Sequence, residues 1–389
     1  MGPVLYRTVM SSVSFIGSEI YRDSSYGRGH PLAIPRVSLA TDLIAALDGF
    51  ADGSYIDSPT ADAACLQRFH TPDYVAAVMQ AERDQDAPPE VRRRHNIGIN
   101  GNPIFAEMFS RPATAVGGGG KAAELVKAGG VAFNPGGGQH HARPDQASGF
   151  CYFNEPALTI GALREQGCQR IFYLDLDAHH GDGVQAAFHD DAQVFTLSIH
   201  EAGRWPMSRR NQDSSGPGGI NDRAGGMARN LPVPPGFNDD ELEVLTEAVV
   251  LPLIQSFEPD AIFVQCGVDA LDDDPQSRLQ LSNTALWRTV AALVGQAPRL
   301  IASGGGGYNP FSVARAWAGL WCVLAGHEVP DRLPRQAEDL LRGIVWPHRR
   351  APRQEKGQKG GGRRRRPNAG SRHWPTRRIT ARSATRSEP

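Results

Sequence analysis

The chain has 389 residues, 40% of them hydrophobic and 21% charged, and its 41 basic and 42 acidic side chains nearly balance. That is too apolar for a disordered chain, and the length suits one large domain or two ordinary ones. We find no run of about 18 apolar residues and no secretory signal pattern, and the five cysteines are widely spaced without a Cys-x-x-Cys pair. We therefore expect a cytoplasmic protein with reduced thiols, no membrane span and no thiolate zinc finger.

Helical and strand patterns alternate along the chain. Apolar faces predict helices over residues 35–47, 121–127 and 241–254. Short, apolar, β-branched runs predict buried strands at residues 131–133, 171–174, 194–197, 261–264 and 300–302. Strands that are apolar throughout and that alternate with helices are typical of a parallel sheet covered on both faces, so the predicted class is α/β.

Each predicted strand runs directly into a polar or glycine-rich segment. These segments cover residues 134–141, 175–183, 198–200, 265–269 and 303–308. In open α/β sheets, ligands bind beyond the carboxyl ends of the strands. Five strands that deliver reactive side chains to one edge are a stronger signal than any single motif, so we expect a functional site at that edge.

Three side chains in these segments form a candidate metal site. Asp175, Asp177 and His179 alternate with a period of two, so an extended strand end projects them to one side. Two carboxylates and one imidazole, from Asp177, His179 and Asp269, suit a divalent cation such as Zn²⁺, and three protein ligands leave a fourth position for water or substrate. An ordinary polar turn rarely concentrates so many titratable groups, which favours the metal site.

Two adjacent histidines, His140 and His141, lie in a glycine-rich loop. Imidazole titrates near neutral pH, so the pair suits general acid–base catalysis. Each ring needs a partner that orients it. Asp175 and Asp182 are available for this task once Asp177 is assigned to the metal.

Four motifs together resemble the zinc-dependent histone deacetylase family. They are GGGQHHARPDQASGFCYFNEPAL, YLDLDAHHGDGVQAAF, VQCGVDALDDDP and GGGGYNP, and they occur in the family's order between about Tyr21 and Trp321, with HTPDYV from His70 as a further anchor. The resemblance implies the arginase–deacetylase fold, an α/β domain with a central, mostly parallel sheet of eight strands between helices. We place this single domain at residues 1–347 and a basic tail, expected to be disordered, at residues 348–389.

The resemblance also implies catalytic roles. The three candidate metal ligands would hold one Zn²⁺ per chain. His140 would pair with Asp175 as an electrostatic aid, and His141 would pair with Asp182 and serve as general base and then general acid. Tyr308 would donate its hydroxyl to the oxyanion, an interaction of a kind worth about 3 kcal/mol in other enzymes.

Further positions match the family's substrate channel and a structural ion. Gly149 and Phe150, with Trp205 near the family's second aromatic position, would line a narrow channel for an acyl-lysine side chain. A structural K⁺, held largely by main-chain carbonyls, is implied at Asp175, Asp177, His179, Ser198 and Ile199.

The sequence departs from the family pattern at two places. An Asp that usually grips the substrate backbone at the channel rim is absent here, where the chain reads Ile99-Asn100-Gly101. Gln276 occupies a channel position that is usually Leu or Met. A polar Gln276 either favours a polar or cationic substrate or is a neutral surface change, and we favour the second interpretation.

Two weaker signals receive structural interpretations. Gly117-Gly-Gly-Gly-Lys121 is followed by Ala122 instead of Ser or Thr, so it fails as a phosphate-binding loop and is interpreted as a turn that opens a helix. Cys151 and Cys266 lie next to motif residues without a partner that would activate a thiolate, so we expect them to be packed near the site.

The end of the chain differs in composition from the rest. Residues 349–389 carry 14 Lys+Arg and 2 Glu, a net charge of +12, which leaves −13 on the remainder. Clustered arginines favour nonspecific nucleic-acid binding through counterion release. A solvated inert extension, or a stretch that was never selected as protein sequence, explains the composition equally well.

The sequence thus predicts a zinc-dependent amidohydrolase that removes acetyl or related acyl groups from protein lysine side chains. An acetylated polyamine or another small acylated amine is the alternative substrate, and the acidic body would attract either kind of cationic molecule. Arginase-like chemistry with two manganese ions needs further ligands, and the loop that ends in Tyr308 argues against it. A non-catalytic module that binds acyl-lysine or nucleic acid is disfavoured because all the catalytic motif residues are present. The oligomeric state is left open.

Overall fold

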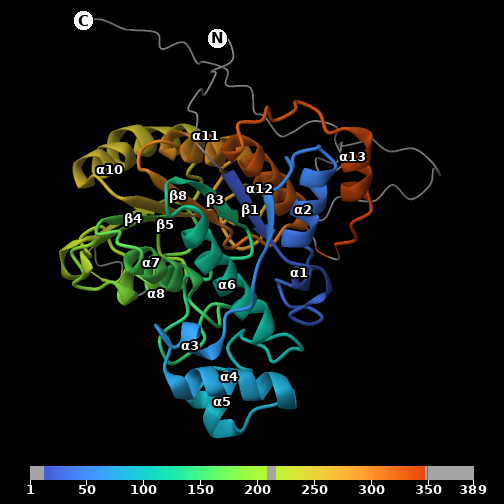
Figure 1. Ribbon diagram of the computed structural model, residues 1–389, viewed down its shortest axis with the longest axis vertical. Coiled ribbons are helices and arrows are strands. Elements are labelled where there is room, and N and C mark those ends of the chain that lie inside the picture. Colours follow the sequence, from blue (N-terminus) through green and yellow to red (C-terminus); the bar gives the residue numbers. More distant parts are fainter. Residues whose placement is uncertain (1–12, 208–215, 347, 349–389) are drawn as a thin grey trace, which may run out of the picture.

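The computed structural model describes residues 13–207, 216–346 and 348 of the chain. Within them, one sheet has the strand order β2-β1-β3-β8-β7-β4-β5-β6, and every neighbouring pair is parallel (Figure 1). The strands are β1 (Val13–Gly17), β2 (Tyr55–Asp57), β3 (Gly130–Asn134), β4 (Ile171–Asp175), β5 (Val194–Glu201), β6 (Ala228–Val233), β7 (Ala261–Gln265) and β8 (Arg299–Ser303).

Helices connect the strands and enclose the sheet. They are α1 (Ile20–Asp23), α2 (Val37–Ala45), α3 (Ala63–Leu66), α4 (Pro72–Asp84), α5 (Pro89–His95), α6 (Ser110–Leu125), α7 (Glu155–Glu165), α8 (Asp182–Ala187), α9 (Asp239–Leu245), α10 (Leu251–Phe257), α11 (Asn283–Leu293), α12 (Pro310–Leu324) and α13 (Arg335–Arg342). A 3₁₀ turn, η1 (Ala224–Gly226), precedes β6, and a π-helical turn, η2 (Thr246–Val250), joins α9 to α10. No helix in these described ranges combines the length and the apolar character needed to cross a membrane.

The alternation of side chains along the strands divides the core into two layers. Phe172 and Leu174 of β4 face one side, where α2 and α9 to α13 pack. Ile171 and Tyr173 face the other side, where α6, α7 and α8 pack. Because both faces are covered, every residue of β4 is buried, and this explains why the sequence of the strand is apolar throughout.

A third apolar cluster lies outside the two layers. It joins α4 and α5, at the lower end of the molecule in Figure 1, to the loop that follows the histidine pair, through buried side chains such as Tyr74, Tyr152 and Phe153. The Tyr74 hydroxyl donates to the carbonyl of Tyr152 (2.7 Å), and the Asn154 N–H donates to His70 Nε2 (3.0 Å). The cluster therefore anchors the loop that carries Gly149 and Phe150.

The structure confirms the α/β class and the five predicted strands, and it adds β1, β2 and β6. The helix predicted at 35–47 is α2, and the one predicted at 241–254 is formed by α9, η2 and α10. The predicted disorder of the tail, and the domain boundary at residue 347, lie outside the described residues.

The interpretation of residues 117–121 as a turn before a helix is wrong, because the glycine run lies inside α6. The first three glycines of the run, Gly117, Gly118 and Gly119, allow close packing of this helix against its neighbours. A Cβ atom on Gly117 would overlap the carbonyl of Pro59, whereas a Cβ atom on Gly120 would meet nothing within 4 Å.

This difference makes a matched pair of variants. We expect Gly117→Ala to lower the free energy of unfolding by about 1–3 kcal/mol, because overpacking forces the backbone to shift. Gly120→Ala in the same helix should raise it by about 0.5–1 kcal/mol, because alanine loses less conformational entropy. Urea unfolding of both variants measures the two changes. A Gly117→Ala variant as stable as Gly120→Ala would contradict the packing argument.

Candidate active site

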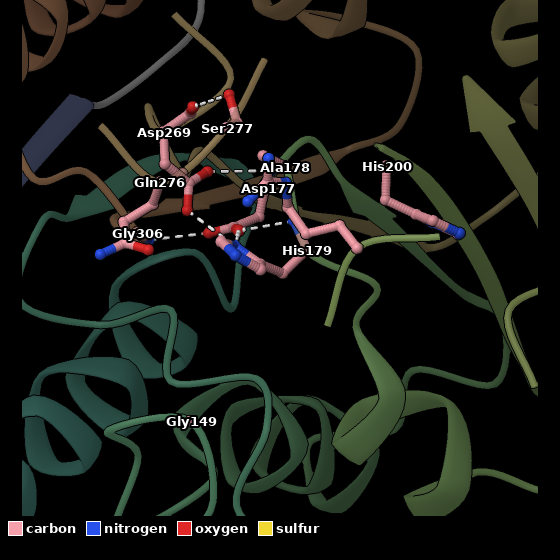
Figure 2. Close-up of polar contacts among 12 residues, drawn as sticks. Gly149, Asp177, Ala178, His179, His200, Asp269, Gln276, Ser277 and Gly306 are labelled. Carbon is pink, nitrogen blue, oxygen red and sulfur yellow. Dashed lines mark hydrogen bonds and ion pairs between the residues drawn. The ribbon is translucent and has the colours of Figure 1, made fainter. Parts of the chain in front are cut away.

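Three potential metal ligands meet at the carboxyl edge of the sheet. Asp177 and His179 follow β4, Asp269 follows β7, and β4 and β7 are paired neighbours, so their ends lie together. One ligand atom from each residue lies within 4.8 Å of the others. His179 Nδ1 lies 3.1 Å from Asp177 Oδ1 and 2.9 Å from Asp269 Oδ2, as Figure 2 shows.

The donor set of this triad fits a divalent cation. Gln265 Nε2 (3.1 Å) and the Gly306 N–H (2.7 Å) donate to Asp177 Oδ2, and the Ala178 N–H donates to Asp269 Oδ1 (2.8 Å). These bonds hold one oxygen of each carboxylate and leave the other facing His179. Burial lowers the pKa of His179, but attraction by Asp269 and Asp177 prevails and raises it to about 10. The site therefore favours a positive charge at its centre, and its two carboxylates and one imidazole are ligands that Zn²⁺ takes.

The histidine pair lies beside the triad, and each ring has its own carboxylate. His140 Nδ1 lies 2.8 Å from Asp175 Oδ2, which also accepts the Tyr173 hydroxyl (2.6 Å). His141 Nδ1 lies 2.7 Å from Asp182 Oδ1. The two ring centroids are 3.9 Å apart. Each Asp accepts the Nδ1–H of its histidine, which leaves Nε2 of both rings for the reacting groups.

The environment separates the proton affinities of the two rings. For His140, attraction by Asp175 and Asp177 outweighs burial and raises the pKa to about 9. For His141, burial and the neighbouring charge of His140 lower the pKa to about 4. At neutral pH the pair thus combines a protonated His140 with a neutral His141, and two rings in different protonation states can take different roles.

Tyr308 approaches the triad from the glycine loop after β8. Its main-chain N–H donates to Asp274 Oδ2 (2.6 Å), and Arg36 Nη1 donates to the carbonyls of Gly305 (3.0 Å) and Gly307 (3.1 Å). Burial and the charge of Asp269 raise the pKa of Tyr308 well above its usual range, so the hydroxyl keeps its proton. The loop therefore presents a hydrogen-bond donor to the cavity.

A cavity of about 40 Å³ connects these groups. Its lining includes His140, His141, Asp177, His179, Gly149, Phe150, Cys151 and Tyr308. Phe150 has a φ of 68°, which a bulky residue rarely adopts, and its N–H donates to Asn102 Oδ1 (2.9 Å). The third cluster and this bond hold the ring in place as a wall of the cavity.

Trp205, predicted to line the channel, is not among the residues that line the cavity, but it lies next to His141, which does. Its side chain is 49% exposed, and its ring centroid is 4.7 Å from that of His141. A Cβ atom on Gly149 would come within 2.5 Å of both Trp205 and His141, so only glycine leaves room for the indole ring. Gly149, His141 and Trp205 are therefore closely packed beside the cavity.

Two further positions considered in the sequence, Gln276 and Asn100, are not among the residues that line the cavity. Gln276 is half-buried, and its N–H donates to Asp274 Oδ1 (2.8 Å), so a single carboxylate joins its loop to that of Tyr308. Asn100 is exposed, and its Nδ2 donates to Asn96 Oδ1 (2.8 Å). The next residue, Gly101, packs closely on the Phe150 ring, which places the turn at the mouth.

Three residues of the predicted potassium site are adjacent in the sheet, and the other two, Asp177 and His179, follow β4. Asp175 at the end of β4 pairs with Ser198 of β5, and Ile199 follows on the same strand. The Ser198 hydroxyl lies 2.8 Å from His200 Nδ1 and accepts the Gly181 N–H (3.4 Å).

Cys151 and Cys266, expected near the site, are both buried, and all five cysteines are free.

Sequence reasoning missed four buried polar residues around the site: Arg36, Glu155, Gln265 and Asp274. Gln265 and Asp274 lie within quoted motifs, but neither has a spacing that distinguishes it from its neighbours. Glu155 also lies within a quoted motif, and no sequence signal marks it or Arg36 as buried.

Comparisons with known proteins agree with this geometry. The sequence pattern described as the histone deacetylase domain matches residues 30–324. The chain belongs to the histone deacetylase family. The acetoin utilization protein AcuC of Bacillus subtilis (strain 168) is 35% identical over 330 residues, 81% of this chain and 84% of that protein. The putative histone deacetylase 2 of Caenorhabditis elegans is 35% identical over 315 residues, 79% of this chain and 61% of that protein.

Solved structures of histone deacetylase homologues share the fold. A crystal structure of a homologue in complex with SAHA has a TM-score of 0.80 and 39% sequence identity, and the match covers 86% of this chain and 89% of that one. A homologue from Aquifex aeolicus gives a TM-score of 0.78 at the same identity and coverage. The buried group of Asp177, His179 and Asp269 is typical of the zinc site of this family.

A substitution at the triad tests metal binding directly. We expect Asp269→Asn to lose most of its zinc, because a neutral amide is a poor zinc ligand and the site loses one negative charge. Mass spectrometry on dialysed protein measures the zinc content per chain. Asp272→Asn, at an exposed acidic residue of the same loop, is the matched control and should keep its zinc. Retention of full zinc by Asp269→Asn would remove this residue from the ligand set.

Proposed function

We propose that the protein is a zinc-dependent amidohydrolase that removes acetyl or related acyl groups from lysine side chains of proteins. The observation that carries the proposal is the assembly, around one small cavity, of the metal triad, the His141–Asp182 pair and the protonated Tyr308 hydroxyl. Hydrolysis of an unactivated amide needs an electrophile, a base and an oxyanion donor, and this cavity supplies a candidate for each.

Asp177, His179 and Asp269 would hold the zinc, which when bound polarises the substrate carbonyl and lowers the pKa of a water to about 7. His141, neutral and fixed by Asp182, accepts the proton of the attacking water at Nε2 and then delivers it to the leaving amine. His140, kept protonated by Asp175, supplies positive charge beside the developing oxyanion. The Tyr308 hydroxyl donates a hydrogen bond to that oxyanion.

The cavity walls support a substrate with a linear amine arm. Phe150 and Trp205 would enclose the methylene groups of a lysine side chain, and Gly149 leaves the space between them. Gln276 lies on the loop next to Tyr308 and would contact the substrate near the mouth. A K⁺ ion, held by main-chain carbonyls at Asp175, Asp177, His179, Ser198 and Ile199, would stabilise the strand ends that carry the site.

An acylated polyamine is the second candidate substrate, and the mouth of the cavity favours it at one point. The exposed turn at Asn100 offers a neutral amide where the family usually has a carboxylate that grips a peptide backbone. A small amine does not need that grip.

The proposed cytosolic location agrees with the five free cysteines, and nucleic-acid binding by the tail stays a prediction.

Removal of the tyrosine hydroxyl tests the mechanism. We expect Tyr308→Phe to lower kcat by about 100- to 1,000-fold, the usual cost of removing an oxyanion donor, and to leave zinc content unchanged. Tyr55→Phe, at a partly exposed tyrosine of β2, is the control and should keep full turnover. Steady-state release of acetate measures both. Unchanged turnover of Tyr308→Phe would exclude this hydroxyl from the reaction.

Turnover of the zinc-loaded wild type on two substrates decides between the candidates. We expect acetate release from an acetyl-lysine peptide, inhibition by a hydroxamate chelator and a lower kcat/KM for acetylated polyamines. Faster turnover of the polyamines would assign the small-amine function. Full zinc without turnover on either class would contradict the proposed function.

A further inference from the structure

Glu155 is a buried acidic side chain for which the proposed mechanism has no role. It is the first residue of α7 and is 0% exposed. Its carboxylate accepts the Gly138 N–H at Oε2 (2.8 Å) and the Thr159 hydroxyl at Oε1 (2.8 Å), and Asn134 Nδ2 lies 3.4 Å from Oε1. Asn134 and Gly138 lie at the end of β3 and in the loop after it, and Thr159 lies in the same helix as Glu155, so the carboxylate joins α7 to the β3 loop.

Glycines on two segments make room for this carboxylate. A Cβ atom on Gly119 of α6 would overlap Glu155 Oε1, and one on Gly137 would lie 2.5 Å from Oε2. Part of the glycine run that resembles a phosphate loop is therefore explained: Gly119 lets α6 approach the acidic group.

Ionisation of Glu155 costs folding free energy. Burial raises the pKa of Glu155 to about 7, above its usual value of 4.5. The titratable groups that face it are the phenols of Tyr21 and Tyr173, and burial raises the pKa of both, so they stay neutral. A neutral side chain of similar shape would avoid the cost, because buried charges are often replaceable without loss of stability.

The partner of Glu155 connects it to the catalytic groups. Gly138 lies two residues before His140 and has a φ of 90°. Its carbonyl accepts Gln265 Nε2 (3.2 Å), and the same nitrogen donates to Asp177 Oδ2 (3.1 Å). The turn is thus held by Glu155 on one side and by the metal-site network on the other.

We propose that Glu155 is a positioning residue for the histidine pair, whose carboxylate fixes the Gly138 N–H and with it the turn that presents His140 and His141. A bond to a charged acceptor is stronger than one to a neutral acceptor, so the ionised form holds the turn more firmly. Asn134 Oδ1, on the amide whose Nδ2 approaches Oε1, is buried without a hydrogen-bond partner among the described residues. The inference rests on the proposed function, because turnover reports the position of the histidines.

The test is Glu155→Gln, which keeps the size of the side chain and imitates its protonated form. We expect unchanged zinc content and KM, and a kcat about tenfold below wild type at pH 8, where Glu155 is ionised. At pH 6 most of the wild type carries a neutral Glu155, so the difference should shrink to about twofold. Because the ratio of the two kcat values is compared, titration of other groups cancels.

Stability against pH provides a second readout. The folded-state pKa of Glu155 lies above its unfolded value, so its contribution to stability is present below pH 4.5 and is lost as the pH rises through about 7. Glu155→Gln does not titrate, so its free energy of unfolding relative to wild type should rise between pH 5 and pH 8. If Glu155→Gln gains stability relative to wild type and still loses turnover, the loss of turnover does not come from poorer folding. That combination therefore identifies a positioning role.

Glu165→Gln, at an exposed glutamate of the same helix, is the matched control and should match wild type in both measurements. Equal kcat values of Glu155→Gln and wild type at pH 8, a loss of kcat that is the same at pH 6 and pH 8, or a loss of zinc would each overturn the inference. A wild type with full zinc and no turnover would instead refute the proposed function, and the inference with it.

A second variant covers the case in which Glu155→Gln does not fold. Thr159→Val removes the hydroxyl donor from Oε1, leaves the Gly138 bond in place and raises the pKa of Glu155 further. Its kcat should fall below wild type by a larger factor at pH 7 than at pH 8.5. A ratio that does not change with pH would overturn the inference.

Discussion

The carboxylates of Asp175, Asp177 and Asp269 are buried at the carboxyl edge of β4 and β7, where little water can balance their charge. The surrounding structure supplies that balance. His140 and the Tyr173 hydroxyl bind Asp175, while the Gly306 N–H, Gln265 and the Ala178 N–H each take one carboxylate oxygen of the triad. The loops after β3, β7 and β8 are therefore held in place by the need to compensate the same buried negative charges.

The same buried carboxylates help to set the protonation states of the side chains that line the cavity. The site raises the proton affinity of His140 through Asp175 and lowers that of His141 through burial and the charge of its neighbour. It also keeps Tyr308 protonated. The cluster that favours one central cation is thereby surrounded by a neutral imidazole and a protonated phenol.

The sequence predicts the centre of the fold better than its edges. The five predicted strands are apolar because both faces of the sheet are covered. Three strands were missed, and two of them lie at the edges of the sheet: β2 is three residues long and partly exposed, and β6 contains Arg229, Asn230 and Pro232. The start of α6 was missed because Pro112 and the glycine run hide its helical pattern.

Local motifs predict the side chains that meet at the site, because each follows a strand end by a short, fixed spacing. They do not predict Glu155, Gln265 or Asp274, whose contacts cross between segments far apart in the chain. Asp274 joins the loops of Gln276 and Tyr308, and only the fold shows that it is buried.

The strand order has a consequence for synthesis of the chain. β8 is the last strand of the sheet among the described residues, and it lies between β3 and β7, so it joins the β2-β1-β3 half of the sheet to the β7-β4-β5-β6 half. A chain emerging from the ribosome has neither a continuous sheet nor a Tyr308 loop until residues beyond Ser303 have been released. Until then both halves expose an unpaired strand edge, the kind of surface that chaperones cover and that aggregation exploits. The sheet and the loop that carries Tyr308 are therefore completed only after β8 has been translated.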